Sequence, residues 1–193
     1  MHTKEKIRLE STELFANLGY EGTSMAKIAE KVGIKKPSLY AHYKNKEALF
    51  FDVVDEMEQE YEAFVQDSLN QETDTIEERL YLSFKTHVSD LARDDASIQF
   101  YNRFIQYPPK ELEDRLLARF NKSEERVRVL LAAVIEKGQA EGSINRELEA
   151  KSMAYTYFCL IEGLTTEVGI HSIEEVKAHA EAVWTVYWRG IQA

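Results

Sequence analysis

The chain has 193 residues, a mass of 22.3 kDa and a net charge of −10 at pH 7, so it is long enough to bury a core in one large domain or two small ones. Its 44% hydrophobic and 30% charged residues exclude a disordered chain and are typical of a folded one. An acidic balance argues against nucleic-acid binding, but residues 1–50 carry nine Lys/Arg against six Asp/Glu, a net of +3, and residues 51–193 carry −13.

Almost every segment has the period of an amphipathic helix rather than that of a strand. Glycine and proline residues fall between these segments, where helices end or begin. Two segments also start with a capping box, formed by Thr75 with Glu78 and by Ser172 with Glu175. In chain order we expect about nine helices, over residues 3–18, 25–32, 37–43, 46–70, 75–92, 95–106, from Pro108–Pro109 to about 140 with or without a break near Asn121, 146–168 and 173–190.

Residues 25–43 have the pattern of a helix-turn-helix, in which a short second helix is offered to the major groove of DNA. Small Ala29 allows the two helices to approach closely, and Gly33 supplies the backbone freedom that the tight turn needs. Four lysines flank the second helix and can reach phosphates on either side: Lys35, Lys36, Lys44 and Lys46. A helical hairpin with solvated lysines would show the same pattern, but the basic charge of this region favours DNA binding.

From Ile7 to Phe50 the sequence resembles the DNA-binding domain of the TetR/AcrR family of transcriptional regulators. The matching residues are Ile7, Leu14-Phe15, Gly19-Tyr20, Thr23-Ser24, Ile28-Ala29, Val32-Gly33-Ile34, Leu39-Tyr40, His42-Tyr43 and Lys46-Glu47-Ala48-Leu49-Phe50. The chain departs from the family where Tyr43 replaces a frequent Phe, where Ser11 and Thr12 replace frequent alanines, and in having Pro37. The resemblance implies an all-α fold in which a three-helix DNA-binding domain with a helix-turn-helix, residues 1–46, precedes a larger helical effector-binding and dimerisation domain, residues 47–193.

The resemblance also implies which residues touch DNA. Thr23 and Ser24 would contact a phosphate at a helix N-terminus, where the backbone dipole favours anions. The start of the second helix would face base edges, while its end and Lys46 would contact the DNA backbone. The predicted DNA-binding residues are Thr23, Ser24, Lys35, Lys36, Pro37, Ser38, Tyr40, His42, Tyr43 and Lys46. Tyr40 could instead pack on the first helix, and His42 could be a solvated helix end.

The last two expected helices carry more apolar surface than one core face needs. A helix that is apolar on more than one face is buried on more than one side. We therefore expect two helices from each subunit to form a four-helix interface in a homodimer, although the same stripes could serve only the core of a single chain. The predicted interface residues are Tyr157, Leu164, Val168, Val183, Trp184, Tyr187 and Trp188.

The middle helices are rich in aromatic residues, which suit a mainly apolar ligand held by a few polar anchors. Most aromatic residues at helical spacing belong to a core, and Glu162 could be an exposed carboxylate rather than an anchor for a cationic ligand. The residues predicted to line the effector pocket are His87, Phe100, Tyr101, Phe104, Tyr107, Phe120, Tyr155, Phe158 and Glu162.

Enzyme motifs are missing from the sequence. It has no glycine-rich phosphate loop, no His-Glu-x-x-His and no Gly-x-Ser-x-Gly. The single cysteine, Cys159, excludes an internal disulfide or a multi-cysteine zinc site, and its apolar neighbours predict a small core residue rather than a nucleophile. We expect no catalytic residues, no metal and no cofactor.

These observations predict a cytoplasmic protein without a membrane partner, because no apolar run is long enough to span a bilayer and the first residues lack an export signal. Its partners would be a double-stranded DNA operator and a small-molecule effector. We predict a ligand-responsive transcriptional regulator, a homodimeric repressor that the effector releases from a palindromic operator. The alternative is a helical ligand-binding or partner-binding module without operator binding.

Overall fold

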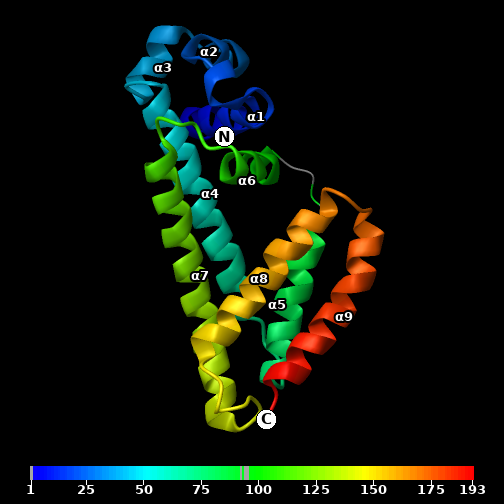
Figure 1. Ribbon diagram of the computed structural model, residues 1–193. Coiled ribbons are helices and arrows are strands. Elements are labelled where there is room, and N and C mark those ends of the chain that lie inside the picture. Colours follow the sequence, from blue (N-terminus) through cyan, green and yellow to red (C-terminus); the bar gives the residue numbers. More distant parts are fainter. Residues whose placement is uncertain (1, 92, 94–95) are drawn as a thin grey trace. The chain divides into compact units, whose positions relative to one another are not determined.

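The computed structural model describes residues 2–91, 93 and 96–193, and this part of the chain is all-α as predicted (Figure 1). Within the described residues, Ile144 and Gln192 form an isolated antiparallel β-bridge. The helices of the described residues are α1 (Thr3–Gly22), α2 (Met25–Val32), α3 (Lys36–His42), α4 (Lys46–Leu69), α5 (Ile76–Asp90), α6 (Ala96–Gln106), α7 (Glu113–Glu141), α8 (Ala150–Val168) and α9 (Ile173–Ile191).

The helix ends follow local signals in the sequence, and they differ most from the expected bounds at the end of α1, at the start of α7, which begins at Glu113 rather than at Pro108–Pro109, and at the start of α8. Helix α1 continues to Gly22 because the chain kinks at Gly19 (φ 73°, ψ 178°) and then resumes a helical turn. Helix α7 runs through Asn121 without a break. Helix α8 begins at Ala150 rather than at 146, because the preceding backbone is bonded elsewhere: the amide of Asn145 donates to the carbonyl of Ile191 at 2.8 Å.

The chain folds as two compact units. We call Met1–Glu60 together with Asp94–Lys122 the head unit, and Tyr61–Arg93 together with Ser123–Ala193 the body unit. Helices α4 and α7 therefore each contribute to both units. The boundaries of these two units differ from the domain boundary predicted at residue 46. That boundary separates a DNA-binding part from an effector-binding part, and it stays a prediction.

The head unit has an aromatic core centred on Phe50. The Phe50 ring lies 5.1 Å from that of Phe15 and 5.0 Å from that of Phe104, both edge to face, and 5.4 Å from that of Phe100. Edge-to-face pairs of this kind stabilise a core beyond the area that they bury. Helix α6 thus supplies two rings to the core of α1 and α4, although α5 lies between α4 and α6 in the chain.

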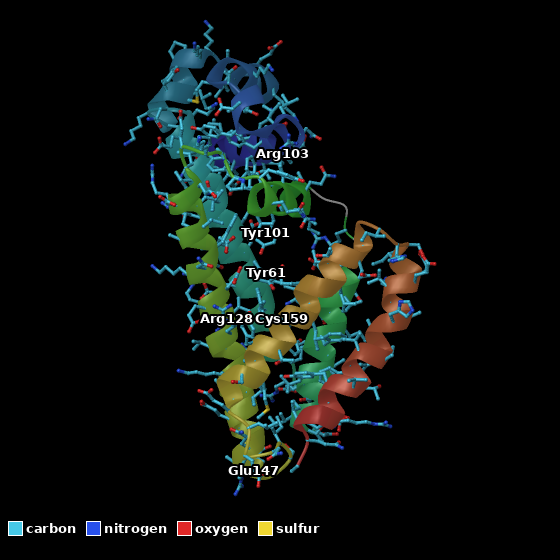
Figure 2. The ribbon with its side chains drawn as sticks, in the orientation of Figure 1. Tyr61, Tyr101, Arg103, Arg128, Glu147 and Cys159 are labelled. Atoms are coloured by element: carbon cyan, nitrogen blue, oxygen red, sulfur yellow. The ribbon has the colours of Figure 1, made fainter. Side chains whose placement is uncertain are left out.

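Helix α6 also holds α1 through Arg103, which is labelled in Figure 2. One guanidinium nitrogen, Nη1, donates to the carbonyl of Ala16 at 2.9 Å and lies 3.4 Å from that of Asn17. These carbonyls lie just before the kink at Gly19, where the helical bond pattern is interrupted. The arginine therefore satisfies acceptors that the kink leaves free.

The body unit has a second core between α5, α8 and α9. Tyr157 packs on Phe84, and Trp184 stacks on Trp188. The hydroxyl of Tyr187 donates to the carbonyl of Met153 at 3.0 Å, so a buried polar group is satisfied. Several of the predicted interface residues are thus buried in the core of a single chain, because the apolar stripes of α8 and α9 pack against each other and against α5.

The prediction that Cys159 lies in the core is wrong, since its side chain is exposed on α8 (Figure 2). A helix turns about 100° per residue, so residue 159 lies about 200° around the axis from the buried Tyr157. Within the described residues, no helix is long and apolar enough to cross a membrane. The same residues contain no cluster of three or more His, Cys, Asp or Glu that could hold a metal ion.

Candidate nucleic-acid interface

Helices α2 and α3 form the helix-turn-helix within the head unit. The Ser24 hydroxyl caps α2 by accepting a bond from the amide of Lys27. Gly33 ends the helix with φ 77° and ψ 31°, a left-handed conformation that other residues rarely adopt. Pro37 lies in the first turn of α3, where its fixed φ fits and its missing N–H is not needed. Local sequence therefore sets both ends of the turn.

The surface of α3 carries six of the predicted DNA-binding residues. Leu39 points into the head unit and is fully buried, so the remaining sides of this seven-residue helix face outward. Lys36 and Tyr40 are one turn apart, with the lysine nitrogen 5.9 Å from the ring centroid. The exposed residues that the structure brings together here are Lys35, Lys36, Pro37, Ser38, Tyr40 and His42. We call them the α3 surface; they offer positive charge, hydroxyl and imidazole groups, and an aromatic ring.

Three predicted DNA-binding residues are engaged inside the head unit instead. The Thr23 side chain is 1% exposed, and its hydroxyl lies 2.8 Å from the Gly19 carbonyl and 3.1 Å from that of Leu14. Tyr43 is 5% exposed and donates its hydroxyl to Asp52. Lys46 donates to the Tyr20 carbonyl at 2.7 Å and lies 3.9 Å from the centre of that ring. Each of these polar groups is hydrogen-bonded within the chain. None of the three therefore belongs to the α3 surface, and their contact with DNA stays a prediction.

Replacing Thr23 with valine is expected to destabilise the protein by about 1–3 kcal/mol, because the Gly19 carbonyl loses its buried hydroxyl donor while the shape of the side chain is kept. The control is Thr23→Ser, which retains the hydroxyl and should stay near the wild-type stability. Chemical denaturation followed by circular dichroism measures both. Equal stabilities of the valine variant and the wild type would show that the Thr23 hydroxyl is not structural.

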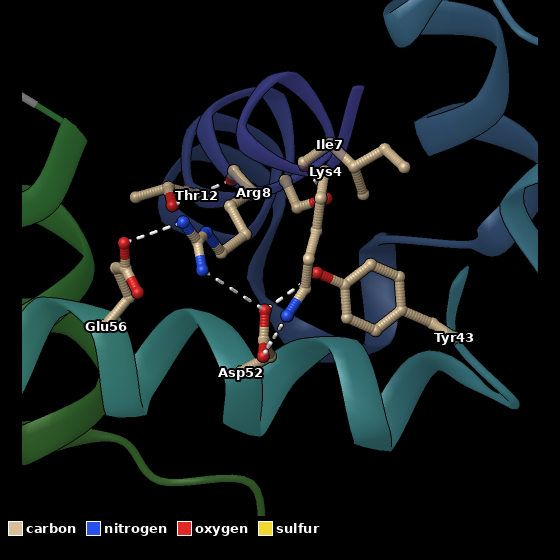
Figure 3. A network of polar contacts seen from close by, with 8 residues as sticks. Lys4, Ile7, Arg8, Thr12, Tyr43, Asp52 and Glu56 are labelled. Carbon is tan, nitrogen blue, oxygen red and sulfur yellow. Dashed lines mark hydrogen bonds and ion pairs between the residues drawn. The ribbon is translucent and has the colours of Figure 1, made fainter. Parts of the chain in front are cut away.

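Behind α3, an ion network connects α1 to α4 (Figure 3). Asp52 lies 3.1 Å from the Lys4 nitrogen and 3.8 Å from Nη1 of Arg8, and Nη2 of Arg8 lies 2.7 Å from Glu56. The Tyr43 hydroxyl donates to the second oxygen of Asp52 at 2.7 Å. Our prediction from sequence missed this network. The signal was present, because Lys4 with Arg8 and Asp52 with Glu56 are oppositely charged pairs of equal i, i+4 spacing.

The residues predicted to line an effector pocket are divided between the two units. The head unit contains Phe100, Tyr101, Phe104, Tyr107 and Phe120, and the body unit contains His87, Tyr155, Phe158 and Glu162. Phe100, Phe104 and Phe120 are buried in the head core, whereas Tyr107 is 75% exposed. A pocket built from the whole set stays a prediction.

His87 is the most enclosed polar member of that set. Its Nδ1 lies 2.8 Å from the Ser83 carbonyl, and its ring lies 4.9 Å from that of Phe64 and 6.1 Å from that of Tyr61. Burial lowers the pKa of His87 below its usual value, so the imidazole is neutral at pH 7. A separate groove of about 240 Å³ in the body unit is lined by other residues: Phe84, Lys85, Val88, Ser89, Lys177, Ala180 and Glu181.

The family model described as "Bacterial regulatory proteins, tetR family" matches residues 7–53, which include α2 and α3. The HTH-type transcriptional repressor ComR of Escherichia coli is 28% identical over 160 residues, a match that covers 81% of this chain and 74% of ComR. A solved TetR transcriptional regulator from Chloroflexus aurantiacus superposes with a TM-score of 0.79 at 20% identity, over 98% of this chain and 96% of that one. Together these matches support a TetR-family regulator.

Other relatives resemble the chain over different lengths. The Biofilm operon icaADBC HTH-type negative transcriptional regulator IcaR of Staphylococcus epidermidis is 47% identical over 47 residues, so the match spans only 25% of IcaR and 24% of this chain. The fatty acid degradation regulator FadR from Bacillus halodurans shares the fold, with a TM-score of 0.78 at 18% identity over 97% of this chain and 95% of FadR. The resemblance inferred from sequence is thus confirmed, and the family is one of regulators rather than of enzymes.

Proposed function

We propose that this TetR-family regulator is a homodimeric repressor that binds a palindromic DNA operator through α3 and leaves it when a small-molecule effector binds the body unit. The observation that carries the proposal is the α3 surface, where Lys35, Lys36, Tyr40 and His42 are exposed on a helix-turn-helix. ComR and IcaR, which are described as a repressor and a negative regulator, support the direction of the effect.

The charge distribution supports DNA binding through the first fifty residues, which include α2 and α3. The first fifty residues carry +3 and the remainder carries −13. Phosphates attract the basic part and repel the acidic part. A dimer would therefore present two heads to one duplex and keep its bodies away from it, and we place its action in the cytoplasm, where the DNA lies.

A dimer would read two half-sites whose centres are about 34 Å apart, one turn of the double helix. An effector could then act by favouring a spacing of the heads that no longer matches successive major grooves. Such an effector must bind the released form more tightly than the DNA-bound form, since a ligand with equal affinity for both shifts nothing.

The proposed dimer interface stays on α8 and α9, but its surface must come from residues that the chain leaves exposed. Tyr157, Leu164, Trp184, Tyr187 and Trp188 are buried within the body unit, and Val168 and Val183 are half-buried. The same helices expose Thr156, Cys159 and Gly163 on α8 and a 73% exposed Val186 on α9. These small or apolar side chains allow close helix contact between two copies.

Selection of duplexes from a random DNA pool by the wild-type protein tests the proposal. We expect an inverted repeat to be enriched and to bind at least roughly a thousandfold more tightly than a scrambled duplex of the same length. Its affinity should fall steeply with salt, with a slope of about −0.9 for each phosphate contacted. Binding no tighter than to the scrambled duplex would support the alternative, a module without operator binding.

A further inference from the structure

We infer that Asp52 of α4 is a positioning residue for operator binding, which fixes the pose of α3 through the hydroxyl of Tyr43. The inference rests on the proposed function, because it concerns how the α3 surface is held for DNA. Asp52 itself would touch no nucleotide.

Tyr43 is the connection between this carboxylate and the helix. It directly follows α3, and its amide donates to the Leu39 carbonyl at 3.0 Å, so its backbone closes the last turn of the helix. Its ring is buried in the head core and its hydroxyl donates to Oδ2 of Asp52 at 2.7 Å. A displacement of the ring would therefore displace the end of α3, where Tyr40 and His42 lie.

Asp52 is held in turn by two cationic residues of α1. Its Oδ1 accepts a bond from Lys4 at 3.1 Å, and Arg8 lies 3.8 Å from its Oδ2 while pairing with Glu56. One carboxylate thus connects the first turn of α1, the end of α3 and the second turn of α4, as Figure 3 shows. The carboxylate of Asp52 also has two cationic partners, Lys4 and Arg8. Its charge therefore stays compensated when the tyrosine hydroxyl is removed.

The hydrogen bond from Tyr43 to Asp52 is stronger than the ion pair of Asp52 with Lys4. The Lys4 side chain is half exposed, and ion pairs in contact with water contribute little because the charges are screened. The tyrosine bond is short, shielded by the core and directed to an ionised oxygen, which strengthens it. Burial and the neighbouring Asp52 raise the pKa of Tyr43, so its hydroxyl remains a donor at neutral pH.

The burial of Tyr43 also separates two roles that sequence alone cannot distinguish. A tyrosine that grips DNA would expose its hydroxyl, whereas this hydroxyl points to Asp52 beneath the helix. The two roles differ in their dependence on Asp52. A hydroxyl that bonds a phosphate contributes the same whether or not Asp52 is present, whereas a positioning bond loses its effect once Asp52 is removed.

Tyr43→Phe removes the hydroxyl and keeps the ring. Its matched control is Tyr81→Phe, because Tyr81 on α5 also donates to a carboxylate, that of Glu181 at 2.8 Å, but in the body unit. On the duplex that the wild type enriches, we expect Tyr43→Phe to bind about tenfold more weakly, which corresponds to about 1.4 kcal/mol. The salt slope and the affinity for a scrambled duplex should equal those of the wild type, and Tyr81→Phe should bind as the wild type does.

A double-mutant cycle then assigns the effect to Asp52. After Asp52→Ala, the further change Tyr43→Phe should cost less than about twofold, because the partner of the hydroxyl is already gone. Full additivity of the two losses would overturn the inference. So would unchanged operator binding by Tyr43→Phe or an equal loss in Tyr81→Phe.

Hydrogen exchange of the α3 amides in the DNA-free protein tests the same bond without an operator. We expect exchange in α3 to be about tenfold faster in Tyr43→Phe, with α9 unchanged, because only the local opening of α3 becomes easier. If the wild type enriches no duplex, the proposed function fails and this measurement decides alone: unchanged protection of α3 would overturn the role of the Tyr43 bond in holding the helix.

Discussion

Replacing Phe50 with alanine is expected to cost roughly 3–5 kcal/mol, the usual loss when a buried phenylalanine is truncated. The ring is 0% exposed and contacts five other rings of the head unit, from α1, from α6 and from its own helix: Phe15, Tyr20, Phe51, Phe100 and Phe104. Because a domain is stable by only about 5–15 kcal/mol, this loss is a large part of the total. Hydrogen exchange of α1 and α6 should accelerate strongly, and thermal unfolding should begin at a lower temperature.

The matched control is Tyr107→Ala, which also truncates an aromatic residue of the head unit. Tyr107 is 75% exposed, so this change should lie within about 0.5 kcal/mol of the wild type. If Phe50→Ala unfolded at the wild-type temperature, or if both variants lost the same stability, the aromatic cluster would not be the core of the head.

Reversing the charge of Lys35 and Lys36 together should weaken operator binding roughly a hundredfold or more at moderate salt. Each lysine that contacts DNA contributes about 1–3 kcal/mol, and a glutamate adds repulsion by the phosphates. Both side chains are exposed on the α3 surface, so the fold should not change. Fluorescence anisotropy with the selected duplex measures the affinity, and sedimentation checks that the oligomeric state is kept.

The control for this variant reverses Lys85 and Lys137, two exposed lysines of the body unit that lie on α5 and α7 rather than on the proposed dimer helices. It changes the net charge of the chain by the same amount but leaves the head unit intact. We expect its operator affinity to stay within about threefold of the wild type, since exposed charges more than a Debye length of about 10 Å from the DNA are screened. A similar loss in both variants would mean that the overall charge, rather than α3, governs binding.

Much of the fold could be predicted because the signals for helix ends are local. Gly33 and Pro37 lie directly at the ends of α2 and α3, and the capping box of Ser172 with Glu175 forms as predicted. The start of α8 was missed because its backbone competes with a partner far away in sequence, the end of α9. No pattern within residues 146–150 reports that competition.

The exposure of the α3 residues could be predicted, because it follows from helix geometry. The intrachain hydrogen-bond partners of the other predicted site residues could not be predicted. A hydroxyl beside a helix start has the same sequence pattern whether it bonds a phosphate or a carbonyl, and Thr23 bonds carbonyls of α1. Tyr43 and Lys46 are partnered by residues nine and twenty-six positions away. For Trp184 and Trp188, an apolar stripe predicts burial but does not say whether the same chain or a second copy covers it.

The composition of the head unit has a consequence for chimeric regulators. Its core is discontinuous in sequence, since α6 supplies Phe100 and Phe104 to the rings of α1 and α4 and its Arg103 caps the kink of α1. A graft that exchanged only the first sixty residues with another regulator would pair a foreign α1 with this α6. Transfer of DNA specificity between relatives therefore requires either exchanging α6 along with the head or restricting the exchange to the exposed residues of α3.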